Sequence, residues 1–260
     1  MMKKEALLNK WLQEEKIAHV HGWDFSHIEK YYKECDLPWS YREIIGRYLT
    51  PDMKLLDIDT GGAEFILSLN HPYENLAATE GYPPNVILCK EKLIPLGVDF
   101  KETHGCQDVL PFEDQTFDMV INRHGDINEK EIWRILKPNG FFITQQVGAE
   151  NNRNLVKLLL NKVPPLPFPN QYLKTIQNSL EDVGFTTLEA EEVYGPMKFF
   201  DVGALVWFAH IIEWEFPNFS VQTCLSNLYH AQEIIEQKGE LEGTIHRFYL
   251  VLQKTNKHIL

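Results

Sequence analysis

The sequence predicts an α/β protein whose parallel strands are joined by helices, and three observations support this fold class. Short apolar runs at 55–58, 76–79, 119–122 and 141–147 are separated by stretches of helical character. Alternation of this kind implies right-handed crossovers between parallel strands. The first run also ends in a turn of small residues followed by helical spacing, which is where such sheets hold nucleotide-like cofactors.

The first 50 residues are expected to form helices that cap the sheet. Apolar residues recur at helical spacing over Leu7–Leu12, and a second such set follows between 28 and 32. We expect the first set to pack against the body of the protein, with a membrane or partner helix as the alternative. The predicted domains are therefore a helical cap at 1–50 and a larger domain at 51–260, with a helical insertion at about 195–240.

A proline-rich segment at 161–170 is expected to form a stiff connector, because proline is disfavoured in helix interiors and central strands. Aromatic residues at helical spacing in the insertion predict core packing. They are Phe199, Phe200, Trp207, Phe208 and Trp214. Beyond the connector, the pattern predicts a helix at 171–183, a strand at 185–193, helices at 202–215 and 222–237, and a final strand at 244–253.

Composition narrows the function classes. The net charge of -12 and the pI near 5.3 disfavour binding to a phosphate backbone, which requires clustered Lys and Arg. Four scattered cysteines form no CxxC pair, and nearby acids do not complete a ligand set for the histidines at 19, 21 and 27, so no metal site is expected. With no secretory signal and no apolar run of membrane-spanning length, we expect a soluble cytoplasmic protein.

The glycine turn reads Asp57-Ile58-Asp59-Thr60-Gly61-Gly62-Ala63. It resembles the first motif of class I S-adenosylmethionine (SAM) dependent methyltransferases, which is acid-x-Gly-x-Gly-x-Gly. Asp57 and Gly61 keep that pattern, whereas Asp59 and Ala63 stand where the outer two glycines are expected.

Later segments extend the resemblance in the family's order, over roughly residues 50–260. Glu80 ends the second predicted strand 23 residues after Asp57, close to the spacing of a ribose-binding acid. LPFEDQTFDMV at 110–120 and RILKPNG at 134–140 are similar to the family's segments around the fourth and fifth strands. The resemblance implies a Rossmann-like, mostly parallel sheet of seven strands, with helices on both faces, an antiparallel last strand and an N-terminal helical cap.

The resemblance also implies SAM as cofactor, S-adenosylhomocysteine as product, and a set of cofactor-binding residues. The family commonly has an acid for the adenine amino group where this chain has Cys106. If Asp59 lay about 4 Å from the SAM carboxylate, repulsion would cost roughly 4 kcal/mol at an effective dielectric of 20. If the Asp59 carboxylate faced the amino group or the sulfonium of SAM instead, its charge would strengthen SAM binding. The implied set is Asp57, Asp59, Thr60, Gly61, Gly62, Glu80, Gly81, Cys106, Gln107, Asn122 and Arg123.

His124 is the candidate general base, because it follows the fourth strand of the resemblance, where cofactor and acceptor meet. A purely structural role at the strand end is its alternative. Trp23, Tyr31 and Tyr32 could form an apolar wall for the substrate, and Gln145 could bond a polar acceptor. The alternative for the three aromatic residues is ordinary packing of the cap. The alternative for Gln145 is a hydrogen bond within the protein at the end of its strand.

We therefore expect a SAM-dependent methyltransferase that acts on an O or N acceptor of a small molecule. An RNA methyltransferase is one alternative, which the acidic charge disfavours. A degenerate protein that keeps the fold without catalysis is another, motivated by Asp59, Ala63 and Cys106. A nicotinamide dehydrogenase is the weakest, because the G-x-G-x-x-G spacing is not present. The acceptor and the oligomeric state stay open.

Overall fold

The computed structural model describes residues 2–19, 25–103 and 109–255. The chain forms two compact units, and strands β7 (Phe185–Phe199) and β8 (Leu241–Lys254) contribute residues to both. The large unit comprises 37–147, 170–192 and 247–260, and the small unit comprises 1–36, 148–169 and 193–246.

The described residues contain a sheet of eight strands in the order β1-β7-β8-β6-β5-β2-β3-β4. Pairing is parallel between β2 and β3, β3 and β4, β2 and β5, and β5 and β6, and antiparallel between β6 and β8 and between β1 and β7. This confirms the predicted mostly parallel sheet with an antiparallel last strand, although the described sheet has eight strands where seven were predicted, because β1 pairs with β7. The other strands are β1 (Tyr32–Glu34), β2 (Leu55–Ile58), β3 (Leu76–Glu80), β4 (Asp99–Glu102), β5 (Phe117–Arg123) and β6 (Leu136–Val147).

In the large unit, the sheet separates two hydrophobic cores. Successive strand residues point to opposite faces, so Leu55 packs in one core and Leu56 in the other. Helices α2 (Tyr41–Tyr48), α3 (Glu64–Ser68) and α4 (Pro83–Leu93) contribute to the first core. Helices α5 (Glu129–Ile135) and α7 (Leu173–Val183) contribute to the second. The short helices of the unit are η2 (Tyr73–Asn75) and η3 (Ile94–Leu96).

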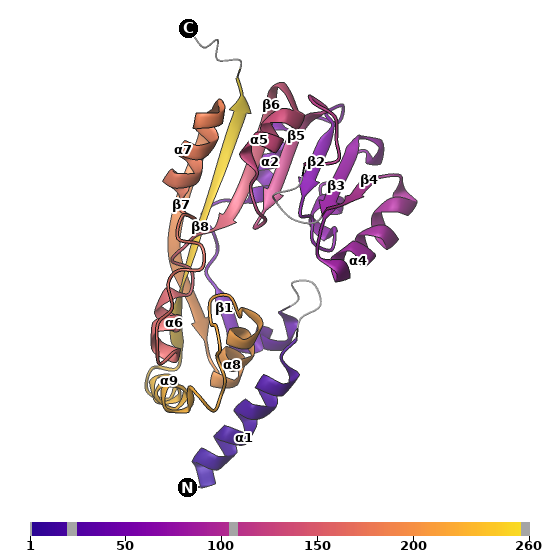
Figure 1. The fold of residues 1–260 in the computed structure, drawn as a ribbon. Helices are drawn as coiled ribbons and strands as arrows, with labels where there is room; N and C mark the ends of the chain where they lie inside the picture. The colour runs from indigo at the N-terminus through magenta and orange to yellow at the C-terminus, as the bar shows by residue number, and fades with distance from the viewer. Residues whose placement is uncertain (1, 20–24, 104–108, 256–260) are drawn as a thin grey trace. The chain divides into compact units, whose positions relative to one another are not determined.

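Parallel register brings the predicted site residues to one edge of this sheet. Ile58, the last residue of β2, pairs with Asn122 near the end of β5. Arg123 in turn pairs with Gln145 of β6, and Gln145 pairs with Tyr249 of β8. The carboxyl ends of β2, β3, β5 and β6 therefore share one edge, where open α/β sheets bind ligands (Figure 1).

The small unit has its own core. Helix α1 (Met2–Ile17) contacts α8 (Val202–Ile211). Trp11 of α1 is fully buried, and its ring lies 5.2 Å from that of Tyr229. The predicted packing of the first apolar stripe is thus confirmed. The remaining elements are η1 (Ser26–Tyr31), α6 (Arg153–Leu159) and α9 (Leu225–Lys238).

Three expectations differ from the structure. Residues 32–34, predicted as helical, form strand β1 against the end of β7, because β7 continues well past the predicted limit at 193. The aromatic set of the insertion divides: Phe199, Trp207 and Phe208 are buried, whereas Phe200 and Trp214 are 40% and 41% exposed.

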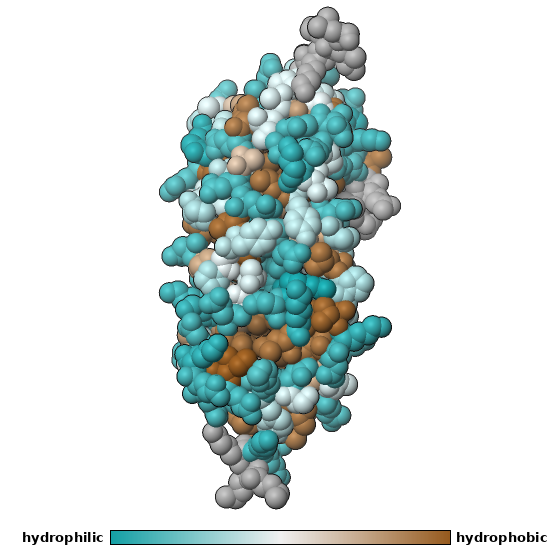
Figure 2. All heavy atoms as spheres, turned by 90° about the vertical axis from the view of Figure 1, so that its left-hand side faces the viewer, coloured by the Kyte–Doolittle hydropathy of each residue, from teal (hydrophilic) through white to brown (hydrophobic). Residues whose placement is uncertain are grey.

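Hydrophilic side chains cover much of the face shown in Figure 2, with hydrophobic ones between them. Within the described residues, every helix is too short or too polar to cross a membrane.

Candidate cofactor and acceptor site

The glycine turn keeps a left-handed backbone at all three positions where the motif has glycine. The φ angles are +56° at Asp59, +65° at Gly61 and +69° at Ala63. For a residue with a side chain this conformation costs about 1–2 kcal/mol, and Asp tolerates it better than Ala. The turn therefore has the shape of the motif although two of its glycines are replaced.

Hydrogen bonds to two buried acids fix this turn. Thr60 Oγ1 donates to Asp57 Oδ2 over 2.7 Å, and the Gly61 N–H donates to Glu80 Oε2 over 2.8 Å. The N–H groups of Gly81 and Tyr82 both donate to Glu80 Oε1, also over 2.8 Å. Glu80 thus joins the end of β3 to the turn that follows β2, and a Cβ on Gly61 would meet open space.

Burial sets the charge state of this acidic cluster. Desolvation raises the pKa of Asp57 to about 7, opposed by the Thr60 hydrogen bond and the positive charge of Arg123. Desolvation, followed by the charges of Glu80 and Asp126, raises the pKa of Asp59 to about 6. The acids repel one another, so a cation placed among them would be stabilised.

The Asp59 carboxylate points toward the loop between β5 and α5. It accepts a hydrogen bond from the backbone N–H of Asp126, and a Cβ on Gly125 would lie 2.6 Å from its Oδ2 atom. The sequence alone leaves open which way the Asp59 carboxylate points.

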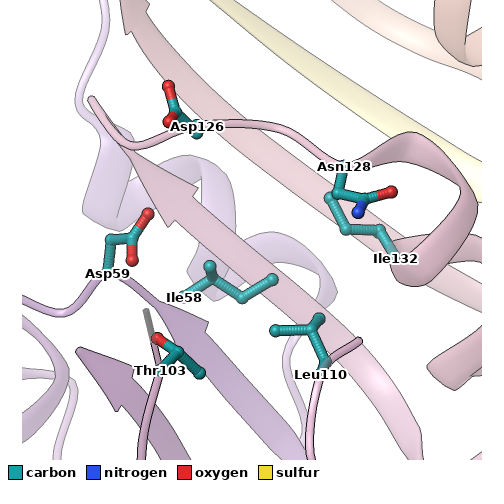
Figure 3. Close-up of a pocket in the computed structure, with 7 residues that line it drawn as sticks. All are labelled: Ile58, Asp59, Thr103, Leu110, Asp126, Asn128 and Ile132. Atoms are coloured by element: carbon teal, nitrogen blue, oxygen red, sulfur yellow. The ribbon is translucent and has the colours of Figure 1, made fainter. Parts of the chain in front are cut away.

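A recess of about 330 Å³, counting the part open to solvent, lies beside Asp59. Figure 3 shows Asp59 and Asp126 on one side and Asn128 and Ile132 on the other, with Ile58 between them. Apolar walls with carboxylates at one side suit a flat ring that carries an amino group. Cys106 and Gln107 lie outside the described residues. The lining consists of Ile58, Asp59, Thr103, Leu110, Asp126, Asn128 and Ile132.

Asn122 uses its side-chain amide within the protein. Its Nδ2 donates to the Ile58 carbonyl over 3.2 Å, and its Oδ1 accepts from Gln146 Nε2 over 2.6 Å. The Tyr41 hydroxyl reaches the backbone carbonyls of Asn122 and Ile143, at 3.0 and 2.9 Å. These bonds tie β2, β5, β6 and α2 together beneath the edge of the sheet.

His124 follows Arg123 in a left-handed conformation with φ of +66°, and its backbone N–H donates to the Gln145 carbonyl over 2.9 Å. Its side chain lies at the end of a hydrogen-bonded row. Trp39 Nε1 donates to Gln145 Oε1 over 2.9 Å, and Gln145 Nε2 lies 3.3 Å from His124 Nε2. The Trp39 ring is held in turn at 5.0 Å from the ring of Tyr249.

Two guanidinium groups act on His124. Desolvation, followed by the positive charges of Arg247 and Arg123, lowers the pKa of its imidazole well below the usual range. His124 is exposed at the surface, and the positive charges of both guanidinium groups favour its neutral imidazole. The Arg123 guanidinium lies over the Phe65 ring, 4.5 Å from its centroid.

The structure brings most of the predicted cofactor residues together, from Asp57 to Gly62 and at Glu80, Gly81 and Asn122–Arg123, along with His124 and Gln145. Tyr31 and Tyr32 belong to the small unit, where Tyr31 is 48% exposed and Tyr32 packs on Phe199. Trp23 lies outside the described residues. Their predicted role as a substrate wall stays a prediction.

Sequence reasoning missed several residues of this edge. Thr103, Leu110 and Ile132 line the recess, but each sits among ordinary strand, loop or helix residues with no motif of its own. Asp126 could have been found from the sequence, because it is the last residue of the polar segment 122–126 at the end of β5. Trp39 lies within the predicted cap at 1–50, but its bond to Gln145 spans 106 positions and leaves no local pattern.

Comparisons with known proteins agree with this geometry. Residues 56–144 match the family model described as a methyltransferase domain. No protein of curated function matches the chain by sequence.

Solved structures share the fold at low identity. A protein of Bacillus halodurans C-125 named as a candidate methyltransferase is 15% identical, with 84% of this chain and 99% of that chain covered and a TM-score of 0.56. A functionally unknown protein of Deinococcus radiodurans R1 is 13% identical over 98% of this chain and 100% of that chain, with a TM-score of 0.57. The [4+2]-cyclase SpnF is 16% identical over 97% of this chain and 95% of that chain, with a TM-score of 0.50.

The matched segment contains most of β2, the glycine turn, Glu80 and the end of β5. Residues 56–144 thus match a methyltransferase domain, and the chain has the Rossmann-like fold of methyltransferases.

Proposed function

We propose that the chain binds SAM at the carboxyl edge of the large unit and transfers its methyl group to an O or N acceptor of a small molecule. The observation that carries this proposal is the turn at 59–63, which keeps left-handed φ angles at all three glycine positions of the motif. A chain with no use for this backbone shape would be expected to lose it, because two non-glycine residues maintain it at an energetic cost.

The residues of the edge fit SAM. Glu80, which holds the turn through backbone N–H groups, is proposed to accept the ribose hydroxyls as well. The recess beside Asp59 is the proposed place for adenine, because its walls are apolar and its carboxylates could accept from the amino group. Gly61 leaves open space through which the ligand can approach the backbone closely.

SAM, when bound, supplies a methyl group on a cationic sulfur, ready for in-line displacement. The chain's own task is then to hold the two reactants in line and to exclude water. The acids at Asp59 and Asp126 favour a cationic ligand. The ends of β5 and β6, with Arg123, His124 and Gln145, are the part of the edge proposed to position the acceptor.

A small molecule is favoured as acceptor because the chain's charge of -12 opposes nucleic acid. The alternative of a fold without methyl transfer also has support, since the [4+2]-cyclase SpnF shares this fold. Such a protein would bind SAM or S-adenosylhomocysteine, or neither, without consuming SAM.

Calorimetric titration of the full chain with SAM and with S-adenosylhomocysteine tests the proposal. We expect saturable binding of SAM with a dissociation constant of about 1–100 μM, corresponding to roughly 5.5–8 kcal/mol. Absence of heat with both ligands at about 1 mM, a level that detects even weak sites, would contradict it. Glu64→Gln, a change at an exposed acid of α3, serves as the control that leaves binding intact.

A further inference from the structure

The row formed by Trp39, Gln145 and His124 determines where the imidazole of His124 carries its proton. The indole N–H of Trp39 can only donate, so the Gln145 atom that it meets at 2.9 Å is the amide oxygen. The amide nitrogen of Gln145 therefore faces His124 Nε2 at 3.3 Å.

An amide nitrogen has hydrogens to donate and no lone pair to offer, so His124 Nε2 must be the acceptor. A proton on Nε2 would oppose the Gln145 amide hydrogens, which disfavours both the Nε2–H tautomer and the doubly protonated imidazolium. His124 is consequently neutral, with its proton on Nδ1, and the lowered pKa of its imidazole agrees with this assignment.

The surroundings of His124 are positively charged, in a protein that is acidic as a whole. Arg123 precedes it, with its guanidinium held over Phe65. In the antiparallel pair of β6 and β8, Val147 lies opposite Arg247 and Gln145 lies opposite Tyr249. Because side chains alternate between faces, Arg247 is on the same face of the sheet as Gln145. An N–H donor beside two guanidinium groups suits an anion.

We propose that this end of the site binds a carboxylate of the methyl acceptor, with His124 Nδ1–H and Arg123 as its donors, which assigns Arg123 to the acceptor rather than to the cofactor. This inference rests on the proposed function, because it names the substrate class of the same site. The proposal replaces the hypothesis of His124 as general base. The lone pair of Nε2 accepts from Gln145, and the lowered pKa opposes uptake of a further proton, so the imidazole acts as a donor through Nδ1–H. An acceptor that is already ionised at neutral pH needs no base.

Nuclear magnetic resonance of the histidine ring nitrogens in the S-adenosylhomocysteine-saturated full chain tests the proposal, with His124→Gln used to assign the signal. We expect the proton on Nδ1 at neutral pH. Benzoate should shift this signal saturably, whereas benzamide, its neutral counterpart, should leave it in place. A proton found on Nε2, or equal responses to benzoate and benzamide, would overturn the proposal.

Matched variants separate this role from a structural one. Arg123→Gln should weaken benzoate binding about tenfold, in keeping with a lost charge-assisted hydrogen bond, while Arg42→Gln on the exposed face of α2 should not. Gln145→Glu offers acceptors to both neighbours, so it should move the His124 proton to Nε2 and weaken benzoate binding. Equal effects of Arg42→Gln and Arg123→Gln, or an unmoved proton in Gln145→Glu, would contradict the assignment.

SAM affinity, measured by calorimetry on the same protein free of S-adenosylhomocysteine, distinguishes the two proposals. Benzoate binding without any SAM binding would refute the methyltransferase proposal and leave the anion site standing. SAM binding without a benzoate response would refute the anion site alone.

Discussion

Two regions of the same sheet edge have opposite electrostatic character. The ends of β2 and β3 present acids, with Asp57, Asp59 and Glu80 crowded around the glycine turn. The ends of β5 and β6 present N–H donors and cations, centred on Arg123 and His124. SAM carries one net positive charge, from its sulfonium and amino groups less its carboxylate, so the acidic region suits the cofactor and the basic region an anionic acceptor. The predictions below test this division, from the largest expected effect to the smallest.

Asp57→Asn tests whether the acidic region carries an electrostatic cost. Burial raises the folded pKa of Asp57 to about 7, above the unfolded value of 3.8. The folded state then holds more protons between these values, so Asp57 stabilises the fold at low pH and this stability is lost as pH rises toward 7. Between about pH 5 and pH 8 the free energy of unfolding should fall by roughly 3 kcal/mol more in the wild type than in Asp57→Asn. Urea denaturation at both pH values measures this, and parallel pH profiles for the two proteins would refute it.

Glu80→Gln tests the link between the acidic region and the cofactor. The change replaces one carboxylate oxygen by an NH₂ group that faces backbone N–H donors of the turn or of α4. SAM affinity should fall about 100-fold, because a charge-assisted acceptor for the ribose is lost and the turn is disturbed. Calorimetry measures the affinity, with Glu64→Gln as the control for the same loss of charge; an unchanged affinity in Glu80→Gln would break the comparison.

Asp59→Gly separates backbone shape from charge at the turn. Glycine accepts the φ of +56° without strain, but it removes a carboxylate from the acidic region. Binding of SAM and of S-adenosylhomocysteine should weaken alike, by about tenfold, because both ligands carry the adenine amino group that Asp59 is proposed to accept from. Tighter binding of SAM to Asp59→Gly would show that the acid is a defect of the site.

Ala63→Gly should have the smallest effect. Relief of the left-handed strain at φ of +69° is opposed by loss of a buried methyl group and by a more flexible unfolded chain. The free energy of unfolding should change by less than about 1 kcal/mol and SAM affinity should stay within a factor of about 3. A loss of SAM binding here would mean that the turn depends on the Ala63 side chain rather than on its backbone shape.

Much of the acidic region could be predicted from the sequence, because its parts are local. The strand, turn and helix around Asp57–Gly62 lie within one contiguous segment, and Glu80 follows at a spacing set by a single βαβ unit. Residue type makes a left-handed φ angle tolerable at Asp59 but does not predict it at Ala63, where the hydrogen bonds of the turn hold the shape.

The basic region was less predictable, because its contacts are distant in sequence. The contacts of His124 come from three separate segments: the loop before α2 with Trp39, strand β6 with Gln145 and strand β8 with Arg247. The strand register brings β6 and β8 beside His124. The sequence indicated His124 as a titratable residue at a strand end. The proton position depends on the orientation of one glutamine amide, which no sequence pattern encodes.

A crystal structure of the full chain with S-adenosylhomocysteine tests the central claim most directly. The account predicts the ribose at Glu80, the adenine in the recess beside Asp59 and Asp126, and the sulfur facing the ends of β5 and β6, where His124 lies. A cofactor bound in the reverse direction, with adenine beside His124, or bound away from the glycine turn, would contradict the division of the site into an acidic cofactor region and a basic acceptor region.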